Sequence, residues 1–304
     1  MSFSLAEIRH LYDFQSHYLT RNGFNYHYLD EGEGDPVVLL HGNPSWSFMY
    51  RELVRSLRDT YRTVVPDHIG CGLSDKPVDN EYDYTLERRV SDLEALLDQI
   101  GATRGITLIM HDWGGLIGMT YAARNPSRIG RLVILNTAAF LLPPEKVLHW
   151  SLSFCRDSRL AAFLIRRFNA FARIASYIGC RQRPMPKEIR RAYTAPYDSW
   201  QNRVATLNFI RDIPLTSADP SYASLQNTQD NLFRFRETPM LICWGERDFI
   251  FDGYFLNEWI RRFPEAQVHR FPEAGHNILE ESPEVIARLV RDFLASHPLK
   301  RAAE

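Results

Sequence analysis

Short apolar runs that alternate with amphipathic stretches restrict the fold of this chain more than any other feature of its sequence. The runs have the length of buried strands, and they span residues 37–40, 63–65, 106–110, 132–135, 240–244 and 268–271. Between them lie helix candidates such as residues 85–100, where Leu, Val and Ile recur at helical spacing. Buried strands separated by helices predict an α/β fold, with a mostly parallel sheet covered by helices on both faces.

Turn and cap residues mark both ends of the alternating pattern. Residues 14–19 and 24–29 alternate polar and aromatic side chains, and Arg21-Asn22-Gly23 between them predicts a hairpin. Near the C-terminus, Ser282-Pro283-Glu284 combines an N-cap residue, a proline at the first helical position and an early acidic residue. We expect a helix to begin there.

Residues 139–225 interrupt the alternation, because no clear strand occurs in them. Helical stretches such as 150–177 are separated there by several prolines. We predict a helical cap over 139–228, inserted after the sixth strand between two parts of the core, 1–138 and 229–304. Residues 139–225 hold 13 Lys and Arg against 6 Asp and Glu, a net charge of +7. Two explanations of this charge stay open. The charges belong either to solvated helix faces or to a surface that binds an acidic partner, an anionic substrate or a lipid.

Composition excludes several classes of protein. A net charge of −1 and a pI of about 6.8 do not fit a nucleic-acid binder that relies on bulk positive charge. The 45% hydrophobic content is too high for a disordered chain. No apolar stretch approaches the roughly 20 residues of a membrane span, and the N-terminus lacks a basic and then apolar secretory signal. We therefore expect a cytoplasmic protein with no integral membrane segment and no nucleic-acid partner.

The four cysteines are widely spaced and form no CxxC pair, which argues against a disulfide framework or a zinc site. Cys243 lies in the apolar run MLICW and is expected to be a reduced core residue. The sequence leaves open whether Cys71, Cys155 or Cys180 forms a bridge and whether the chain forms a homodimer.

The residues after each apolar run are candidates for a site, because ligands of an open parallel sheet bind beyond the carboxyl ends of its strands. Asp112, Asp248 and His276 follow three different runs, in that chain order. A nucleophile, an acid and a base can be drawn from this set. The segments that follow the runs are 41–44, 67–68, 111–115, 136–137, 245–248 and 274–276.

Asp112 lies between an apolar strand and an apolar helix and is followed by Trp113, Gly114 and Gly115. This is the strand–turn–helix setting of a nucleophile elbow, with aspartate where many hydrolases carry serine. Met110 departs from the glycine that the serine pattern has two residues before the nucleophile. The alternative is that Asp112 is only the N-cap of the helix.

An aspartate nucleophile has a chemical consequence, because it forms an ester with the carbon that it attacks. Water must then cleave the ester, and His276 is expected to be the base that activates the water. The histidine needs a carboxylate to fix its tautomer. Asp248 is our choice for this acid and Glu246 is the reserve, whereas Asn136 is neutral and cannot serve.

Asn43 and Trp113 are candidates for donors to a departing anion. Their backbone N–H groups are expected to form an oxyanion hole, and their side chains add an amide and an indole N–H. Neutral donors beside a carboxylate nucleophile suit a halide, whereas a cation there would pair with Asp112. A plain turn at Asn43 and a packed aromatic ring at Trp113 are the alternatives. We expect no metal or organic cofactor, since no HExxH motif or complete dinucleotide loop occurs.

These motifs resemble the α/β-hydrolase fold and, within it, the haloalkane dehalogenases. They are HGNP at 41–44, DHIGCGLSDKP at 67–77, HDWGG at 111–115, WGERD at 244–248 and AGHNILEE at 274–281. The resemblance implies an eight-stranded sheet, with Asp112 as nucleophile, His276 as base and Asp248 as acid. It also implies Asn43 and Trp113 as halide-stabilising donors. Asn43 combined with an acid at position 248 is similar to the third dehalogenase subfamily, which also resembles β-lactone decarboxylases of olefin biosynthesis.

The resemblance implies hydrolytic dehalogenation of a small apolar haloalkane, with an alcohol and a halide as products. Conversion of a β-lactone to an alkene and CO₂ is the alternative. Epoxide hydrolysis would need cap tyrosines as acids, and Tyr177, Tyr193 and Tyr197 are available. The ordered carboxylates and histidine at three strand ends argue against a binding protein without catalysis.

Overall fold

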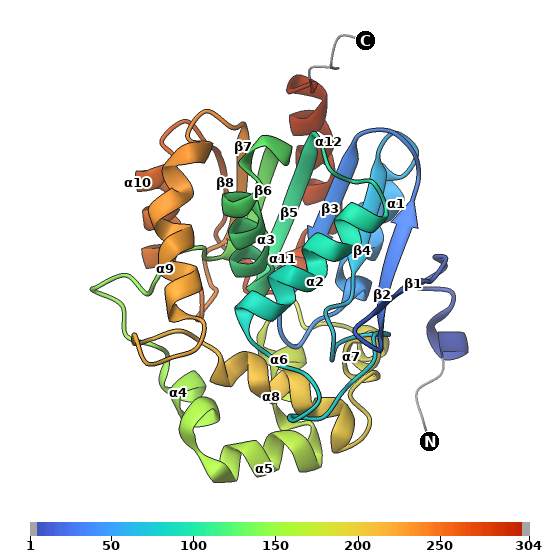
Figure 1. Cartoon of the computed structure of the whole chain (residues 1–304), viewed down its shortest axis with the longest axis vertical. Coiled ribbons are helices and arrows are strands. Elements are labelled where there is room, and N and C mark those ends of the chain that lie inside the picture. Colours follow the sequence, from blue (N-terminus) through green and yellow to red (C-terminus); the bar gives the residue numbers. More distant parts are fainter. Residues whose placement is uncertain (1–4, 300–304) are drawn as a thin grey trace.

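An eight-stranded sheet forms the centre of the computed structural model, which describes residues 5–299 (Figure 1). The strands are β1 (His17–Arg21), β2 (Phe24–Glu31), β3 (Pro36–Leu40), β4 (Arg62–Pro66), β5 (Ile106–Asp112), β6 (Ile129–Thr137), β7 (Met240–Gly245) and β8 (Gln267–Phe271). Their order in the sheet is β1-β2-β4-β3-β5-β6-β7-β8. β2 is antiparallel to β1 and β4, and the other neighbours are parallel. The prediction of a mostly parallel sheet is confirmed.

Helices cover both faces of this sheet. They are α1 (Arg51–Leu57), α2 (Leu86–Gln99), α3 (Trp113–Arg124), α4 (Trp150–Asp157), α5 (Arg159–Phe168), α6 (Ala170–Ile178), α7 (Lys187–Thr194), α8 (Val204–Arg211), α9 (Tyr222–Asn231), α10 (Gly253–Arg262), α11 (Ile278–Glu281) and α12 (Pro283–Ser296). Short 3-10 helices lie at Leu5–Ile8, Ser47–Tyr50, Pro126–Arg128, Gln201–Arg203 and Leu232–Phe235. One face packs against α2, α3, α9 and α10, and the other packs against α1, α11 and α12.

Alternate residues of the central strands face opposite layers of the core. In β3, Val38 and Leu40 belong to one hydrophobic cluster, and Val37 and Leu39 belong to the other. All four side chains are fully buried. Burial on both faces explains why these strands read as continuous apolar runs rather than as alternating ones.

Local signals in the sequence correspond to observed element ends. The β1–β2 hairpin turns at Asn22 and Gly23, whose φ angles of 51° and 85° fit the tight turn expected there. α2 begins after Thr85, whose side chain accepts a hydrogen bond from the backbone of the third residue of the helix. Ser282 is the N-cap residue of α12 with Pro283 at the first helical position, although the Ser282 side chain makes no capping bond.

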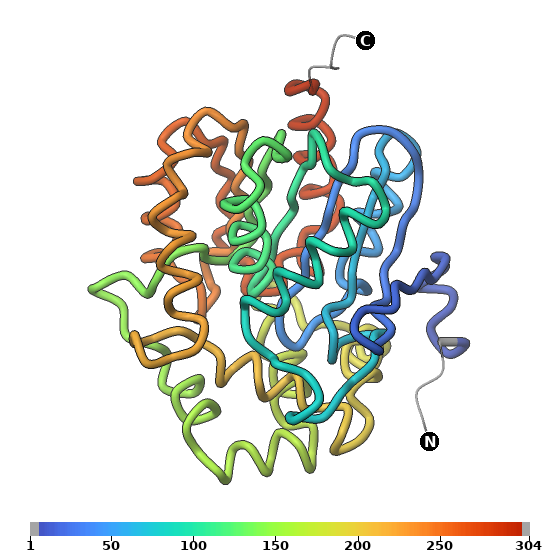
Figure 2. The backbone as a smooth tube through the Cα atoms, in the orientation of Figure 1, coloured from blue at the N-terminus to red at the C-terminus, as the bar shows by residue number. Residues whose placement is uncertain are grey.

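The cap consists of α4 to α8, which are inserted between β6 and β7 and lie together at one end of the sheet (Figure 2). The single helical stretch expected over 150–177 is divided into α4, α5 and α6. Ser158 has extended backbone and caps α5 through the N–H of Ala161, and Asn169 has a left-handed φ of 55° before α6. Neither break contains proline or glycine, which explains why the apolar spacing alone suggested one stretch.

α9 adjoins the core, since it packs against α3 and the hydroxyl oxygens of Thr228 and Thr120 are 2.8 Å apart. The predicted cap boundary at residue 228 falls inside this helix, and the three-part division of the chain stays a prediction. Within residues 5–299, no helix has the length and apolar character needed to cross a membrane. The prediction that the chain has no secretory signal concerns the N-terminus, whose residues 1–4 lie outside the described residues.

Candidate active site

A sharp turn connects β5, which ends at Asp112, to α3, which begins at Trp113. Asp112 has φ 51° and ψ −127°, a strained conformation that persists only where the surrounding structure enforces it. Its side chain does not cap α3. Asp112 therefore occupies the N-cap position of α3 without the side-chain capping bond, and its backbone matches the strand–turn–helix geometry of a nucleophile elbow.

Two glycines permit close packing around this turn. A Cβ atom at Gly42 would meet the carboxylate of Asp112, and a Cβ atom at Gly114 would meet the carbonyl of Leu40 in β3. Both contacts would be far shorter than a normal non-bonded approach. The two glycines therefore let the loop after β3 and the first turn of α3 come close to the carboxylate.

His276 connects the two carboxylates that the sequence placed at other strand ends. Its Nδ1 is 2.7 Å from Asp248 Oδ2, and its Nε2 is 3.8 Å from Asp112 Oδ2. The Asp248 carboxylate accepts the Nδ1–H, which leaves Nε2 directed toward Asp112. Asp112 and Asp248 are buried, and the side chain of His276 is only 16% exposed. The structure thus brings together three residues from three separate segments of the chain.

Burial and neighbouring charges determine the protonation states of His276, Asp112 and Asp248. Burial lowers the pKa of His276, but Asp248 and then Asp112 outweigh burial and raise the pKa to about 9. Burial raises the pKa of Asp112, although His276 and two backbone N–H groups oppose that effect. Burial also opposes ionisation of Asp248, yet His276 holds the pKa of Asp248 below its usual range. At neutral pH the imidazole of His276 is therefore protonated.

Asn136 at the end of β6 holds Asp248 in place. Its Nδ2 donates to Asp248 Oδ2 at 3.1 Å and to the carbonyl of Gly245 at 3.0 Å, and its Oδ1 accepts the N–H of Gly245 at 2.8 Å. The sequence analysis excluded Asn136 as the acid and did not predict its hydrogen bond to Asp248. The position of Asn136 at the end of a strand was the one signal that pointed to the site. Glu246, the reserve acid, instead pairs with Arg270 at the surface.

Two buried histidines stabilise the loops next to these residues. Burial and the nearby His276 lower the pKa of His111 to about 3, so its neutral ring donates from Nε2 to the carbonyl of His276 at 2.8 Å. His41 Nε2 accepts the backbone N–H of His68 at 3.1 Å, and its Nδ1–H donates to the carbonyl of Gly42 at 2.8 Å. These three hydrogen bonds fix the backbone at His276 and in the loops after β3 and β4.

The expected anion donors lie around the carboxylate of Asp112. The backbone N–H of Asn43 donates to Asp112 Oδ1 at 2.7 Å, and the backbone N–H of Trp113 also hydrogen-bonds this carboxylate. The indole of Trp113 packs edge-on against Phe209, 5.3 Å between ring centres. The amide of Asn43 donates to the carbonyl of Thr206 at 3.0 Å, so one of its two N–H bonds is directed at α8 of the cap.

A large apolar cavity lies between the sheet and the cap. Its volume is about 750 Å³, and Asp112, Trp113 and His276 are on its wall. Most of the remaining wall consists of aliphatic and aromatic side chains of the cap, such as Leu164 and Phe171. A cavity of this size and character accepts an extended apolar molecule.

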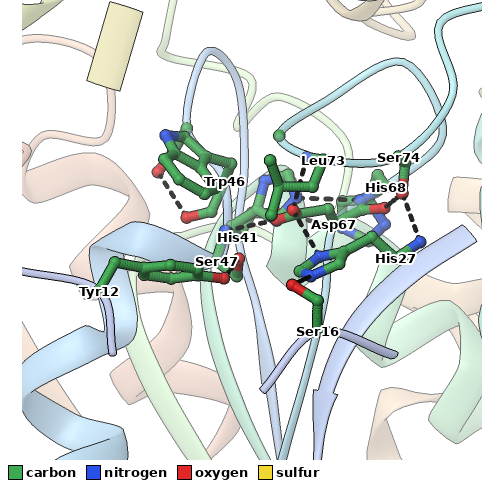
Figure 3. Close-up of polar contacts among 12 residues, drawn as sticks. Tyr12, Ser16, His27, His41, Trp46, Ser47, Asp67, His68, Leu73 and Ser74 are labelled. Atoms are coloured by element: carbon green, nitrogen blue, oxygen red, sulfur yellow. Dashed lines mark hydrogen bonds and ion pairs between the residues drawn. The ribbon is translucent and has the colours of Figure 1, made fainter. Parts of the chain in front are cut away.

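Asp67 and His68, which follow β4, belong to a buried cluster that His41 joins to the loop after β3 (Figure 3). Asp67 Oδ1 accepts the N–H of Ser47 at 2.6 Å, and its Oδ2 accepts the N–H of Leu73 at 2.8 Å and lies 2.8 Å from His27 Nδ1. Burial opposes ionisation, but His27 outweighs it and lowers the pKa of Asp67 to about 2. Within residues 5–299, neither Asp67 nor His68 lines the cavity. The hydrogen bonds of the cluster therefore hold loop backbone in place and do not reach the substrate.

Glu281 fastens the cap to the loop that carries His276. Its Oε2 accepts the N–H of Gly275 at 2.6 Å, and its Oε1 accepts the N–H of Arg181 at 2.7 Å. Glu281 is buried. The sequence motif AGHNILEE contains this residue, but its contact with the cap could not be read from the motif.

The three cap tyrosines do not form the pair of acids that epoxide hydrolysis needs. Tyr177 is 63% exposed, and Tyr197 is buried and donates to the carbonyl of Ser45 at 2.9 Å. Tyr193 lines the cavity, but its hydroxyl donates to Glu280 at 2.7 Å. The geometry therefore gives epoxide hydrolysis no support.

A mostly parallel sheet, an elbow after β5 and a cap between β6 and β7 together define an α/β-hydrolase. A sequence profile described as the alpha/beta hydrolase fold matches residues 35–283. The protein belongs to this family.

Within the family, the chain is similar to two kinds of enzyme. It is 54% identical to cis-3-alkyl-4-alkyloxetan-2-one decarboxylase of Shewanella oneidensis, over 93% of this chain and 89% of that protein. The protein of the same name from Xanthomonas campestris pv. campestris is 49% identical, over 92% of this chain and 95% of its own length. A haloalkane dehalogenase of Mycolicibacterium paratuberculosis is 35% identical, over 92% of each chain. An oxetan-2-one is a β-lactone, so the resemblance to dehalogenases and β-lactone decarboxylases is confirmed.

A solved structure agrees with this relationship. A mutant of the haloalkane dehalogenase DatA from Agrobacterium tumefaciens matches with a TM-score of 0.82 and 26% identity. The match covers 94% of this chain and 99% of that one. It therefore includes the cap as well as the sheet.

Proposed function

We propose that Asp112 attacks an electrophilic carbon of an apolar substrate and becomes bonded to it. The Asn43 N–H holds Asp112 Oδ1, which leaves Oδ2 as the attacking atom. Oδ2 is 3.8 Å from His276 Nε2, and both residues line the cavity. In this proposal Asp248 orients His276, and Asn43 and Trp113 stabilise developing negative charge.

The substrate that we propose first is a β-lactone with an alkyl arm on each of two neighbouring carbons, which the enzyme converts to an alkene and CO₂. The observation that carries this proposal is the 54% identity, over 93% of the chain, to a decarboxylase of cis-3-alkyl-4-alkyloxetan-2-ones. The cavity is compatible with this substrate, because about 750 Å³ of mostly apolar space has room for two alkyl arms.

The proposed β-lactone cycle consumes no water. Asp112 Oδ2 forms a bond to the saturated ring carbon that is bonded to the ring oxygen. The bond between this carbon and the ring oxygen breaks, which leaves a carboxylate on the neighbouring carbon. Loss of CO₂ from that carboxylate supplies the electron pair of the new C=C bond and expels the carboxylate of Asp112. The protonated His276 stabilises the carboxylates during both steps. The products are one alkene and one CO₂, and Asp112 is restored.

Gas chromatography of the products of a cis-dialkyl-oxetan-2-one tests this proposal. We expect alkene from the wild-type protein and none from Asp112→Asn, because an amide does not displace the ring oxygen. The variant should keep its melting temperature within a few degrees, which circular dichroism checks. A wild-type protein that leaves the lactone intact, or opens it only to the hydroxy acid, would contradict the proposal.

Dehalogenation of haloalkanes, which the sequence placed first, is the second candidate function. The dehalogenase relative at 35% identity and the position of Trp113 on the cavity wall beside Asp112 favour it. Asp112 Oδ2 would displace the halide, which leaves as an anion toward the indole N–H of Trp113. Water would then attack the carboxyl carbon of the ester and lose its proton to His276, releasing the alcohol and restoring Asp112.

The charge balance of the site suits this second step. Ester formation removes the negative charge of Asp112, which is one of the charges that raise the pKa of His276. The pKa of His276 therefore falls in the intermediate, which favours loss of the imidazole proton to solvent before water has to be activated. Bromide release from a series of bromoalkanes, with Asp112→Asn as control, tests dehalogenation. Equal release by both proteins would exclude it.

We also propose the cytoplasm as the compartment of the enzyme. The four cysteines are free in the structure, and Cys71, Cys180 and Cys243 among them are buried, as suits a reducing environment. Cell fractionation followed by thiol labelling under denaturing conditions tests this. Labelling that requires prior reduction would contradict it.

A further inference from the structure

The cap carries positive charge that its own acidic residues do not balance. No Asp or Glu occurs between Asp157 and Glu188, a segment that includes α5 and α6. Exposed cationic side chains of this segment that form no ion pair within residues 5–299 are Arg159, Arg167, Arg173, Arg181, Arg183 and Lys187. The cap therefore presents a net cationic surface to solvent.

Exposed apolar side chains occur on the same helices as these cationic residues and on the neighbouring helix α4. On α5, Leu160 and Phe163 are 60% and 48% exposed, and on α6, Ile174 and Tyr177 are 56% and 63% exposed. The members of each pair are three residues apart, so each pair projects from one face of its helix. Trp150 at the start of α4 is 75% exposed. Several large apolar side chains exposed on three consecutive helices are more than the isolated apolar residues of an ordinary surface, and they favour an interaction surface.

The cavity that contains Asp112 reaches the surface within this cluster. Trp150 and Phe154 on α4, and Ile174 and Ile178 on α6, line the cavity and are also exposed. Both helices pack against α5, at the end of the molecule away from α12 in Figure 1. An apolar ligand that enters between α4 and α6 therefore passes exposed apolar side chains that arginines flank.

We propose that this cap face docks on an anionic phospholipid bilayer, with the mouth of the cavity toward the acyl chains. The cap face is defined as Trp150, Leu160, Phe163, Ile174 and Tyr177, together with the six unpaired cationic residues named above. Arginines attract anionic headgroups, and aromatic and aliphatic side chains among them insert at the headgroup boundary. An apolar substrate then moves from the bilayer into the cavity without crossing water.

A lipid surface explains more of these observations than an acidic protein does. An acidic protein would neutralise the arginines, but it would also cover the mouth of the cavity. A bilayer satisfies the charges and leaves the mouth facing an apolar phase. The docking does not depend on which reaction Asp112 performs, so it is tested without any assay of activity.

Sedimentation with sucrose-filled vesicles tests the binding of the full chain. Vesicles of phosphatidylcholine mixed with phosphatidylglycerol should carry the protein into the pellet at low ionic strength. Vesicles of phosphatidylcholine alone should carry far less, and added salt should release the bound protein because it screens the charges. Equal binding to the two kinds of vesicle, or no binding to the anionic kind, overturns the proposal.

Paired variants locate the binding surface. Arg167→Gln combined with Arg173→Gln should weaken binding by about fivefold for each arginine removed. Phe163→Gln with Arg167→Gln should weaken it further than Arg167→Gln alone. The matched control is Phe233→Gln with Arg234→Gln, an exposed pair outside the cap that should bind as the wild type does. Unchanged binding of the cap variants, with an unchanged melting temperature, contradicts the proposal.

Tryptophan fluorescence reports the orientation. Trp150 and Trp200 are exposed, whereas the other four of the six tryptophans are buried. In a Trp200→Phe protein, nitroxide groups on the acyl chains of anionic vesicles should quench the emission of Trp150. Emission that nitroxide lipids leave unchanged would overturn the docking.

Binding of the protein to polyglutamate, measured at the same ionic strength, tests the alternative partner. Binding to polyglutamate without binding to vesicles would assign the cap face to an acidic protein and overturn the proposal.

Discussion

Asp248 depends on a neutral side chain for its position. Asn136→Ala removes one hydrogen bond to the Asp248 carboxylate, and such a bond to a charged group contributes about 1.5–3 kcal/mol. We therefore expect kcat for alkene formation or bromide release to fall by about tenfold to a hundredfold. KM should change little, because Asn136 is not on the cavity wall. Asn231→Ala on the surface of α9 is the control and should leave kcat unchanged.

The charge of Asp112 also influences His276. An NMR titration of the His276 ring should give a pKa of about 9 in the wild type and a lower pKa in Asp112→Asn, because one of the two flanking carboxylates loses its charge. His111 stays neutral throughout, since its pKa is about 3. Cleavage of an ester at Asp112 should accordingly speed up as pH rises through that lower pKa. An equal or higher pKa in the variant would contradict this electrostatic account.

The sequence allows Asp112, Asp248 and His276 to be proposed together, because each follows an apolar run and parallel strands end at one edge of a sheet. The contact between Asn136 and Asp248 could not be predicted in the same way. It depends on the pairing of β6 with β7, where Leu135 faces Cys243, and spacing along the chain does not contain that register. The direction of the Asn43 amide toward α8 likewise depends on how the cap packs.

The loop after β3 and the start of α3 need glycine where they meet. Gly42→Ala would place a methyl group against the Asp112 carboxylate and displace it, and misplacement of a reacting group by about 1 Å costs roughly a hundredfold in rate. We expect activity to fall by about that factor while the protein remains folded. Gly253→Ala is the control, because a Cβ atom there meets open space. Wild-type activity of Gly42→Ala would refute this role of the glycine.

Strands could be predicted better than cap helices, for a physical reason. β3, β5 and β6 are buried on both faces, so each contains a continuous run of apolar residues. The cap helices bury only part of their surface, and the breaks at Ser158 and Asn169 are local backbone choices that ordinary polar residues accommodate. The packing of α9 against α3 is a tertiary contact that periodicity within the helix does not reveal.

The stability of the complete fold should depend on the buried cluster around Asp67. Asp67→Asn leaves His27 and two backbone N–H donors without a charged acceptor, and a buried hydrogen bond to a charged group contributes about 1.5–3 kcal/mol. Urea unfolding should show a loss of that size. Asp13→Asn breaks an exposed pair with Arg55 and should cost at most about 1 kcal/mol. Equal losses in the two variants would contradict the cluster's role.

The same carboxylate predicts a loss of stability in acid. Its pKa in the folded protein is about 2, below the ordinary value of 3.8, so ionised Asp67 stabilises the fold above pH 3.8. That contribution, about 2 kcal/mol, should disappear as pH falls through 2. Urea midpoints measured across this window should therefore fall more steeply for the wild type than for Asp67→Asn. Parallel curves for the two proteins would show that Asp67 does not contribute.

We expect the carboxylate of Asp112 to become bonded to carbon during turnover. The most direct measurement is the mass of the peptide that contains Asp112 after His276→Phe has been incubated with a long-chain bromoalkane. We predict that this peptide gains the mass of the alkyl group less one hydrogen and that fragmentation places the gain on Asp112. An adduct on a different residue, or no adduct with bromoalkane or β-lactone in a variant that remains folded, would contradict the claim.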